Sequence, residues 1–237
     1  MRLIEDIIAS HRSVICLDSG EFNEKVLALV NDSAVVIAAD GAANWMGGKG
    51  LNPQYIVGDG DSFSSALGCS DAEEIFSADQ NTTDFEKCIQ FVEEKGLLPS
   101  LVLGFNGGEI DHVLGNAQVL LNQSEEVSLF FIDSYYKRGR TGIKIGLPLS
   151  EGSYRMTVQI GAIVSILPFC FCRMTSKGLV WELTGQTLTQ DGLLAIRNRA
   201  AKEEIDLHVE KGKALVIIDY LIGSHTAALD IPKELRD

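Results

Sequence analysis

YIVGDGDS (residues 55–62) is a short apolar run that ends in two aspartates, Asp59 and Asp61. A buried strand followed at once by carboxylates places them at the carboxyl end of the strand, where ligands bind in open α/β sheets. VVIAAD (35–40) repeats the pattern and ends at Asp40. Several carboxylates on one edge repel each other unless a cation lies among them, and beside phosphates that cation is commonly Mg²⁺. The segment therefore predicts an α/β sheet whose edge holds a metal and a phosphate ligand.

Apolar, β-rich runs alternate with helical patterns through the first half of the chain. The helix expected after residue 83 is the best marked, because Thr83 and Glu86 form a capping box and Gly96 is a natural stop. Alternating strands and helices predict a parallel sheet with helices on both faces. The predicted strands are 13–17, 34–39, 54–58, 101–104 and 128–132, and the predicted helices are 1–13, 21–31, 84–96 and a segment that begins at 111.

The second half of the chain has a different pattern of polar, glycine and apolar residues. After about Ser134 a polar, glycine-rich stretch (135–146) precedes several strand-like runs separated by turn signals. Apolar and polar residues alternate over 205–209, and 210–213 has the composition of a hairpin turn. We therefore expect an N-terminal doubly wound (Rossmann-like) parallel sheet domain, residues 1–134, followed by a C-terminal antiparallel β-sandwich domain, residues 135–237.

Composition excludes several classes of partner. The net charge is −13, and no basic cluster offsets it, which argues against nucleic acid and anionic membranes. The longest apolar stretch, 160–172, is too short for a membrane span, and the charged N-terminus is unlike a signal peptide. The five cysteines form no CxxC motif, so we expect them to be reduced packing residues. These features predict a cytoplasmic protein.

The GDGDS motif (58–62) has two interpretations. Gly58 and Gly60 leave the backbone unencumbered, so that Asp59 and Asp61 can face one cation while backbone N–H groups approach a phosphate. Alternatively, the motif is a polar turn in which Ser62 caps a helix.

QNTTDFEK (80–87) also allows a structural and a functional interpretation. The capping box alone accounts for Thr83 and Glu86. A helix N-terminus is also a phosphate site, where Asp84 would be a metal ligand, Thr83 a phosphate contact and Lys87 a phosphate cation.

Two further strand ends carry candidate ligand residues. In DGAANW (40–45), Asp40 can accept hydrogen bonds from a ligand and Gly41 permits close backbone approach, although an Asp cap explains the same residues. GFNGGEIDHVLGN (104–116) is a glycine-rich strand-to-helix connection that suits phosphates, but it lacks the GK[ST] of a Walker A sequence. Asp111 is equally suited to cap a helix, with His112 in its first turn.

The order and spacing of these pieces are more specific than any one of them. GDGDS, a TDF-E-K helix start and G-GG-x-x-DH-x-x-x-N together resemble the thiamine pyrophosphokinase family. SILPF (165–169), TSKGLVWEL (175–183) and IRN (196–198) match the C-terminal pattern of that family. The resemblance spans nearly the whole chain.

The resemblance implies an activity and an assembly. The hydroxyl of thiamine attacks the β-phosphorus of Mg·ATP and gives thiamine diphosphate and AMP. The first domain would be catalytic and bind nucleotide and metal, and the second would bind thiamine and form a homodimer with active sites at the subunit interface.

The resemblance also implies roles for individual residues. Trp181 would form an aromatic wall for thiamine, with Asn198 beside it, although a tryptophan in a β-run is otherwise expected in the sandwich core. The Mg²⁺ and diphosphate shell, which includes the catalytic carboxylates, would be Asp59, Asp61 and Asp84. The nucleotide and phosphate contacts would be Asp40, Gly41, Asn44, Ser62, Gln80, Thr83, Lys87, Gly107, Gly108, Asp111 and His112.

Some positions depart from the family pattern. Glu109 stands where the family has arginine, Val180 replaces lysine in GLKW, and Ala195 and Arg197 fall in a segment that is SxSN in the family. These departures leave three hypotheses: an active thiamine pyrophosphokinase, a pyrophosphokinase of the same fold that acts on another small alcohol, and a non-catalytic homologue that binds nucleotide or thiamine.

Overall fold

The computed structural model describes residues 2–18, 24–27, 30, 34–46, 52–64, 71–107, 109–123, 128–137 and 140–222. The chain divides into two compact units. Unit 1 comprises Met1–Ser10, Gln123–Phe130 and Ser134–Asp237, and unit 2 comprises His11–Asn122 and Phe131–Asp133. The functional assignment of 1–134 to catalysis and of 135–237 to thiamine binding and dimerisation stays a prediction.

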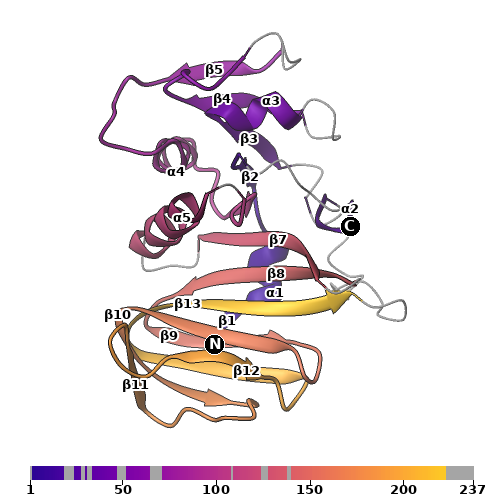
Figure 1. The fold of residues 1–237 in the computed structure, drawn as a ribbon, viewed down its shortest axis with the longest axis vertical. Helices are drawn as coiled ribbons and strands as arrows, with labels where there is room; N and C mark the ends of the chain where they lie inside the picture. Colours follow the sequence, from indigo (N-terminus) through magenta and orange to yellow (C-terminus); the bar gives the residue numbers. More distant parts are fainter. Residues whose placement is uncertain are drawn as a thin grey trace. The chain divides into compact units, whose positions relative to one another are not determined.

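A parallel sheet forms the centre of unit 2, with α4 and α5 beside it (Figure 1). The burial of β2, β3, β4 and β6 is nearly complete, as expected of continuous apolar strands covered on both faces. The strand at the edge, β5, is mostly exposed, which is why its sequence EEIF gave no strand signal. In spatial order the strands are β6 (Ser100–Leu103), β2 (Ser13–Cys16), β3 (Val35–Ala39), β4 (Tyr55–Gly58) and β5 (Glu73–Phe76).

The helices of unit 2 follow the sequence signals where the structure describes them. Helix α4 (Asp84–Glu94) packs against β2, β3 and β4, and the capping box of Thr83 and Glu86 is present. Helix α5 (Ile110–Asn122) begins one residue before the predicted start. The connections after β2 and β3 contain α2 (Glu24–Leu27), then the 3₁₀ turn η1 (Asp40–Ala42) and α3 (Ala43–Met46). Residues 21–23, 28, 29 and 31 of the predicted second helix lie outside the described residues.

The strand order of unit 2 contains a topological switch point. From β2 the chain proceeds to β3, β4 and β5 on one side, and α4 then carries it back to β6 on the other side of β2. In such sheets ligands bind in the crevice beyond the carboxyl ends of the strands. The segments that begin at Asp18, Asp40, Asp59 and Gly104 leave this edge.

Unit 1 is antiparallel around one long strand, β13 (Glu204–Ile222). On one side β13 pairs first with β9 and then with β8, and on its other side it pairs with β10, which also carries β11 and β12. The N-terminal segment joins this unit because β1 (Arg2–Leu3) pairs with β9 and Glu5 of α1 (Ile4–Ala9) accepts a hydrogen bond from Thr157 N. The predicted fold class, parallel α/β followed by antiparallel β, is therefore confirmed. The other strands are β7 (Leu129–Lys137), β8 (Arg140–Leu149), β9 (Gly152–Thr157), β10 (Ile163–Lys177), β11 (Gln186–Thr189) and β12 (Ala195–Arg199).

In unit 1, one stretch without a predicted element proves to be strand, and one local prediction needs correction. The polar stretch 135–146 is largely strand, shared by β7 and β8. The hairpin turn predicted at 210–213 is wrong, because β13 runs straight through it. Gly212 has a φ of 86° and lies opposite a bulge in β10, where a Cβ atom would come within 2.3 Å of the Phe171 carbonyl oxygen. Glycine is needed there for a bulge and not for a turn.

The cysteines that the structure describes are Cys16, Cys88, Cys170 and Cys172, and all four are free thiols. Burial raises the pKa of the Cys172 thiol to about 11, so it is an inert packing residue. Cys170 is exposed, so the packing role predicted for it is wrong, and Cys69 lies outside the described residues. Within the described residues, no helix is both long and apolar enough to cross a membrane.

Candidate active site

Three carboxylates gather where β3 and β4 end. One oxygen from each of Asp40, Asp59 and Asp61 lies within 4.8 Å of the other two. Asp40 is buried, Asp59 is half-buried and Asp61 is exposed, so the group extends from the interior of unit 2 to solvent. Oxygen atoms at this spacing suit a hard divalent cation.

Asp40 is the most constrained member of the group. It is 1% exposed, and its φ of 36° lies in a region that non-glycine residues seldom adopt. Oδ2 accepts a hydrogen bond of 2.9 Å from Ser62 N, whereas the buried Oδ1 has no hydrogen-bond partner among the described residues. Burial raises the pKa of Asp40, and the charges of Asp84, Asp59 and Asp61 raise it further against the opposing effect of Ser62 N–H. A buried carboxylate oxygen without a donor fits a cation ligand.

The GDGDS loop is fixed by hydrogen bonds within and around it. Asp59 Oδ1 accepts from Asp61 N at 3.2 Å, and Ser62 Oγ donates to Asp61 Oδ1 at 2.8 Å. Asn44 clamps the end of the loop, because its Nδ2 donates to the Ser62 carbonyl at 2.7 Å and its Oδ1 accepts from Ser64 N at 2.9 Å. The side chain of Asn44 therefore positions the loop, and its predicted nucleotide contact stays a prediction.

Two glycines let the acidic residues approach each other. A Cβ atom on Gly58 would lie 2.5 Å from Asp40 Cβ and 3.1 Å from Asp84 Oδ1. A Cβ atom on Gly41 would lie 3.2 Å from both Asp18 Oδ2 and Ser62 Cβ. Side chains at these positions would push the carboxylates apart.

The start of α4 adds Asp84 to the three carboxylates. We call Asp40, Asp59, Asp61 and Asp84 together the acidic edge. Lys87 is 6% exposed; its Nζ donates to Asp84 Oδ1 at 3.1 Å and lies 3.9 Å from Asp59 Oδ2. Gln80 Nε2 donates to the same Asp59 oxygen at 2.9 Å. The Thr83 hydroxyl is engaged by its own capping box, which confirms the structural interpretation of that residue. Asp84 thus borders the three-carboxylate group while its charge is paired with Lys87.

The glycine-rich connection after β6 is held by an acidic residue that the sequence analysis missed. Asp133 is 5% exposed, and its two oxygens accept hydrogen bonds from Gly104 N at 3.2 Å and Asn106 N at 2.6 Å. Gly107 N donates to the Gly104 carbonyl at 3.3 Å, and Gly108 lies outside the described residues. Asp133 follows the apolar run SLFFI, so the rule that selected Asp40 applies to it equally.

The start of α5 is open to solvent. Asp111 and His112 are both exposed, and His112 N donates to Asp111 Oδ1 at 3.0 Å. Glu109 is exposed too, and its carbonyl accepts the first helical hydrogen bond, from Val113 N. The structure leaves all three side chains accessible to a ligand.

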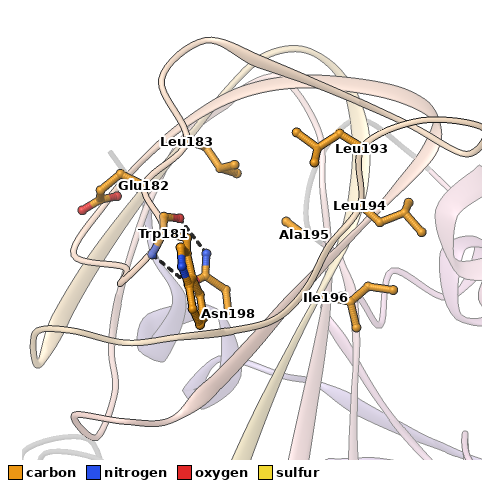
Figure 2. Close-up of a pocket in the computed structure, with 8 residues that line it drawn as sticks. All are labelled: Trp181, Glu182, Leu183, Leu193, Leu194, Ala195, Ile196 and Asn198. Atoms are coloured by element: carbon orange, nitrogen blue, oxygen red, sulfur yellow. Dashed lines mark hydrogen bonds between the residues drawn. The ribbon is translucent and has the colours of Figure 1, made fainter.

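Unit 1 carries a pocket of about 190 Å³ around Trp181 (Figure 2). The indole is 62% exposed, so the alternative of a sandwich-core tryptophan is wrong. Asn198, 4% exposed, holds the Trp181 backbone: it accepts from Trp181 N at 3.2 Å and donates to the Trp181 carbonyl at 2.7 Å. The rest of the lining is largely apolar and consists of Glu182, Leu183, Leu193, Leu194, Ala195 and Ile196.

The turn that presents Trp181 is held by side-chain hydrogen bonds. Glu182 accepts hydrogen bonds of 2.6 Å from both Ser176 Oγ and Gly178 N, and Leu183 N donates to Ser176 Oγ at 2.8 Å. Because the Glu182 carboxylate is used inside the turn, the tryptophan ring is the main recognition group that this segment offers.

Known proteins match both the sequence and the fold. Residues 26–131 match the family model of the thiamin pyrophosphokinase catalytic domain. Over these residues the chain is similar to the thiamin pyrophosphokinase family. Thiamine pyrophosphokinase 1 of Arabidopsis thaliana is 28% identical over 212 residues, covering 81% of this chain and 72% of that protein. Thiamine pyrophosphokinase 1 of Oryza sativa subsp. japonica is 29% identical over 175 residues, and the match spans 65% of this chain and 61% of the rice protein.

Solved structures of the family share the fold. Thiamine pyrophosphokinase from Bacillus subtilis superposes with a TM-score of 0.73 at 19% identity, over 88% of this chain and 99% of that one. Yeast thiamin pyrophosphokinase superposes with a TM-score of 0.74 at 14% identity, over 93% of this chain and 90% of that one. The family match covers β3, β4 and α4, and hence every carboxylate of the acidic edge.

Proposed function

We propose that this protein belongs to the thiamin pyrophosphokinase family and transfers the diphosphate of Mg·ATP to the hydroxyl of thiamine, giving thiamine diphosphate and AMP in the cytoplasm. The observation that carries the proposal is the group of Asp40, Asp59 and Asp61 within the segment that matches the catalytic-domain family. A triphosphate is repelled by this edge unless a cation lies between them. The donors are all oxygen atoms and one is a buried oxygen without a partner, which fits Mg²⁺.

The residues of the acidic edge would act by holding charge and position. Asp40, Asp59 and Asp61 would hold the cation, and Gln80 and Asn44 keep Asp59 and the GDGDS loop in place. Bound Mg²⁺ supplies neutralisation of phosphate charge and alignment of the β-phosphorus. Transfer to a hydroxyl needs chiefly such positioning and electrostatic stabilisation, so a cation-binding edge is sufficient machinery.

The pocket at Trp181 is proposed to hold thiamine. An exposed indole face attracts a cationic ring such as thiazolium, and the apolar lining suits the rest of a small heterocycle. Asn198 would act by fixing the Trp181 backbone, because its amide is engaged there. By family resemblance we expect a homodimer with active sites at the subunit interface.

One observation favours a second candidate, transfer to another small alcohol. The positions that are serines in the family pattern fall in a segment that contributes Ala195 and Ile196 to the pocket, next to Leu193 and Leu194. This lining offers fewer hydrogen bonds than the family pattern implies. A less polar alcohol would then be the better acceptor.

The deciding experiment is an assay of AMP release from ATP with purified protein. Release that requires both thiamine and Mg²⁺ supports the proposal. Release that requires an alcohol other than thiamine supports the second candidate. Folded, metal-loaded protein that releases no AMP with thiamine or with a panel of alcohols refutes both.

Paired variants separate the two sites. We expect Asp59→Asn to lower kcat by about 100-fold or more, because it removes a carboxylate that would hold the cation beside the phosphates. Trp181→Ala should raise the KM for thiamine roughly 3- to 30-fold, as loss of a cation–π contact predicts, and leave the KM for ATP unchanged. Val180→Ala is the matched control, since Val180 is 51% exposed on the same turn but does not line the pocket. Equal effects of Trp181→Ala and Val180→Ala would show that the pocket does not bind thiamine.

A further inference from the structure

Lys87 is a buried cation among the carboxylates of the acidic edge. It lies in the first turn of α4, is 6% exposed, and reaches Asp84 Oδ1 at 3.1 Å and Asp59 Oδ2 at 3.9 Å. A lysine ammonium is strongly hydrated, so its burial is tolerated only when anions replace the water. The carboxylates of Asp84 and Asp59 are the anions that replace water around Lys87.

The negative charges around Lys87 divide into two sets. Asp40, Asp59 and Asp61 place oxygens within 4.8 Å of one another, and Asp84 is not a member of that group. Asp84 instead has Lys87 as its partner, and Asp59 lies between the two sets, accepting from Gln80 and Asp61 N while it faces Lys87. The acidic edge therefore has two positions for positive charge, and a side chain of the protein fills one of them.

We propose that Lys87 is a built-in counter-ion, a positioning residue that fills the second cation position and pairs with Asp84, so that the nucleotide-free protein binds one divalent cation. The inference deepens the proposed function, because the remaining cation position is the one assigned to Mg²⁺. Lys87 also keeps the edge assembled before metal arrives, since without it Asp59 and Asp84 would face each other with no charge between them.

The proposal predicts two effects of Lys87→Met, a substitution of similar length without charge. In EDTA the thermal unfolding midpoint should fall by several degrees, because Asp59 (14% exposed) and Asp84 (34% exposed) lose the cation that lies between them. With Mn²⁺ as the probe and no nucleotide present, the wild type should bind one ion per chain. The variant should bind two, because Asp84 and Asp59 are freed for a second ion.

The measurements are unfolding by differential scanning fluorimetry in EDTA and counting of bound Mn²⁺ by electron paramagnetic resonance. Lys95→Met is the matched control: Lys95 is exposed at the end of the same helix, over the Phe91 ring, and its loss should change neither quantity. Lys87→Arg keeps the charge and should retain one Mn²⁺ per chain.

A double variant keeps the proposal testable if Lys87→Met does not fold without metal. Asp84→Asn combined with Lys87→Met removes both charges, so it should recover most of the lost stability in EDTA and bind one Mn²⁺. The proposal is overturned if the double variant is as unstable as Lys87→Met, or if Lys87→Met has the midpoint and the Mn²⁺ count of the wild type. These readouts require no turnover, so failure of the AMP assay would reject the proposed function without touching this inference.

Discussion

Asp40→Asn should stabilise the protein without metal and remove its response to metal. Asp40 is buried, its Oδ1 lacks a hydrogen-bond partner among the described residues, and burial and three neighbouring carboxylates raise its pKa. An acidic group whose pKa is raised on folding destabilises the folded state as pH rises through its titration range, so ionised Asp40 opposes folding at neutral pH. Asparagine removes that charge, keeps the acceptor for Ser62 N, and tolerates the positive φ of 36° better than most residues.

The size of the effect follows from the unsatisfied oxygen. Leaving a buried polar group without a partner costs about 1–3 kcal/mol. In the variant, an amide N–H replaces that oxygen in a side chain that neighbours the carboxylates of Asp59 and Asp61. We therefore expect the free energy of unfolding in EDTA to rise by about 1–3 kcal/mol, roughly 3–10 °C in Tm. Wild-type protein at a Mg²⁺ concentration about 100-fold above Kd should gain about 2.7 kcal/mol, and the variant should gain far less.

The assay is thermal unfolding of both proteins in EDTA and across a Mg²⁺ titration at pH 7. Asp191→Asn serves as the control, because Asp191 is an exposed acid of unit 1 and the change in net charge is the same. The reasoning fails if Asp40→Asn is less stable than the wild type in EDTA. It also fails if the Mg²⁺ shift of the variant equals that of the wild type, because Asp40 would then not be a cation ligand.

Four further substitutions test other parts of the structure. Gly58→Ala should destabilise the protein by about 1–3 kcal/mol in chemical denaturation, because its Cβ would overlap the acidic edge, whereas Gly115→Ala, with open space in α5, should stabilise it by about 0.5–1 kcal/mol. Arg155→Met should lower the thermal unfolding midpoint slightly at pH 7. Hydrogen bonds from Arg155 lower the pKa of Asp206, so the difference from the wild type should shrink as Asp206 becomes protonated at acid pH. Glu109→Arg should lower the KM for ATP about 2- to 5-fold at low salt, and an unchanged KM would show that this side chain does not face the phosphates.

The parallel strands were predictable from sequence because their burial leaves a direct trace. β2, β3, β4 and β6 are apolar on both faces and appear as unbroken apolar runs. β5 was not predicted, because an edge strand with exposed faces is held by backbone hydrogen bonds to β4. Such bonds leave no pattern in the side chains. The hairpin turn predicted around Gly212 was wrong for a different reason. A glycine with positive φ is as typical of a β-bulge as of a turn.

The candidate site was predictable in part. The position of Asp59 and Asp61 after a strand follows from the sequence, and the capping box at Thr83 is a local pattern. The meeting of Asp40 with them depends on a backbone conformation at φ 36° that no residue pattern specifies. Residue type alone favoured a core position for Trp181, because an aromatic residue in a β-rich segment is usually packed in a core. The family resemblance instead implied an accessible ring, which agrees with its 62% exposure.

Asp133 and Asp40 show how acids at the end of apolar runs can be told apart. Both are buried, but Asp40 directly follows β3 whereas Asp133 lies within β7. The two oxygens of Asp133 accept hydrogen bonds from the backbone N–H groups of Gly104 and Asn106, so its negative charge stabilises that loop. Asp40 has one oxygen satisfied by Ser62 N and one left without a described partner, next to two more carboxylates. The backbone donors around a carboxylate, more than its place in the sequence, therefore decide whether it supports the site or is available to a cation.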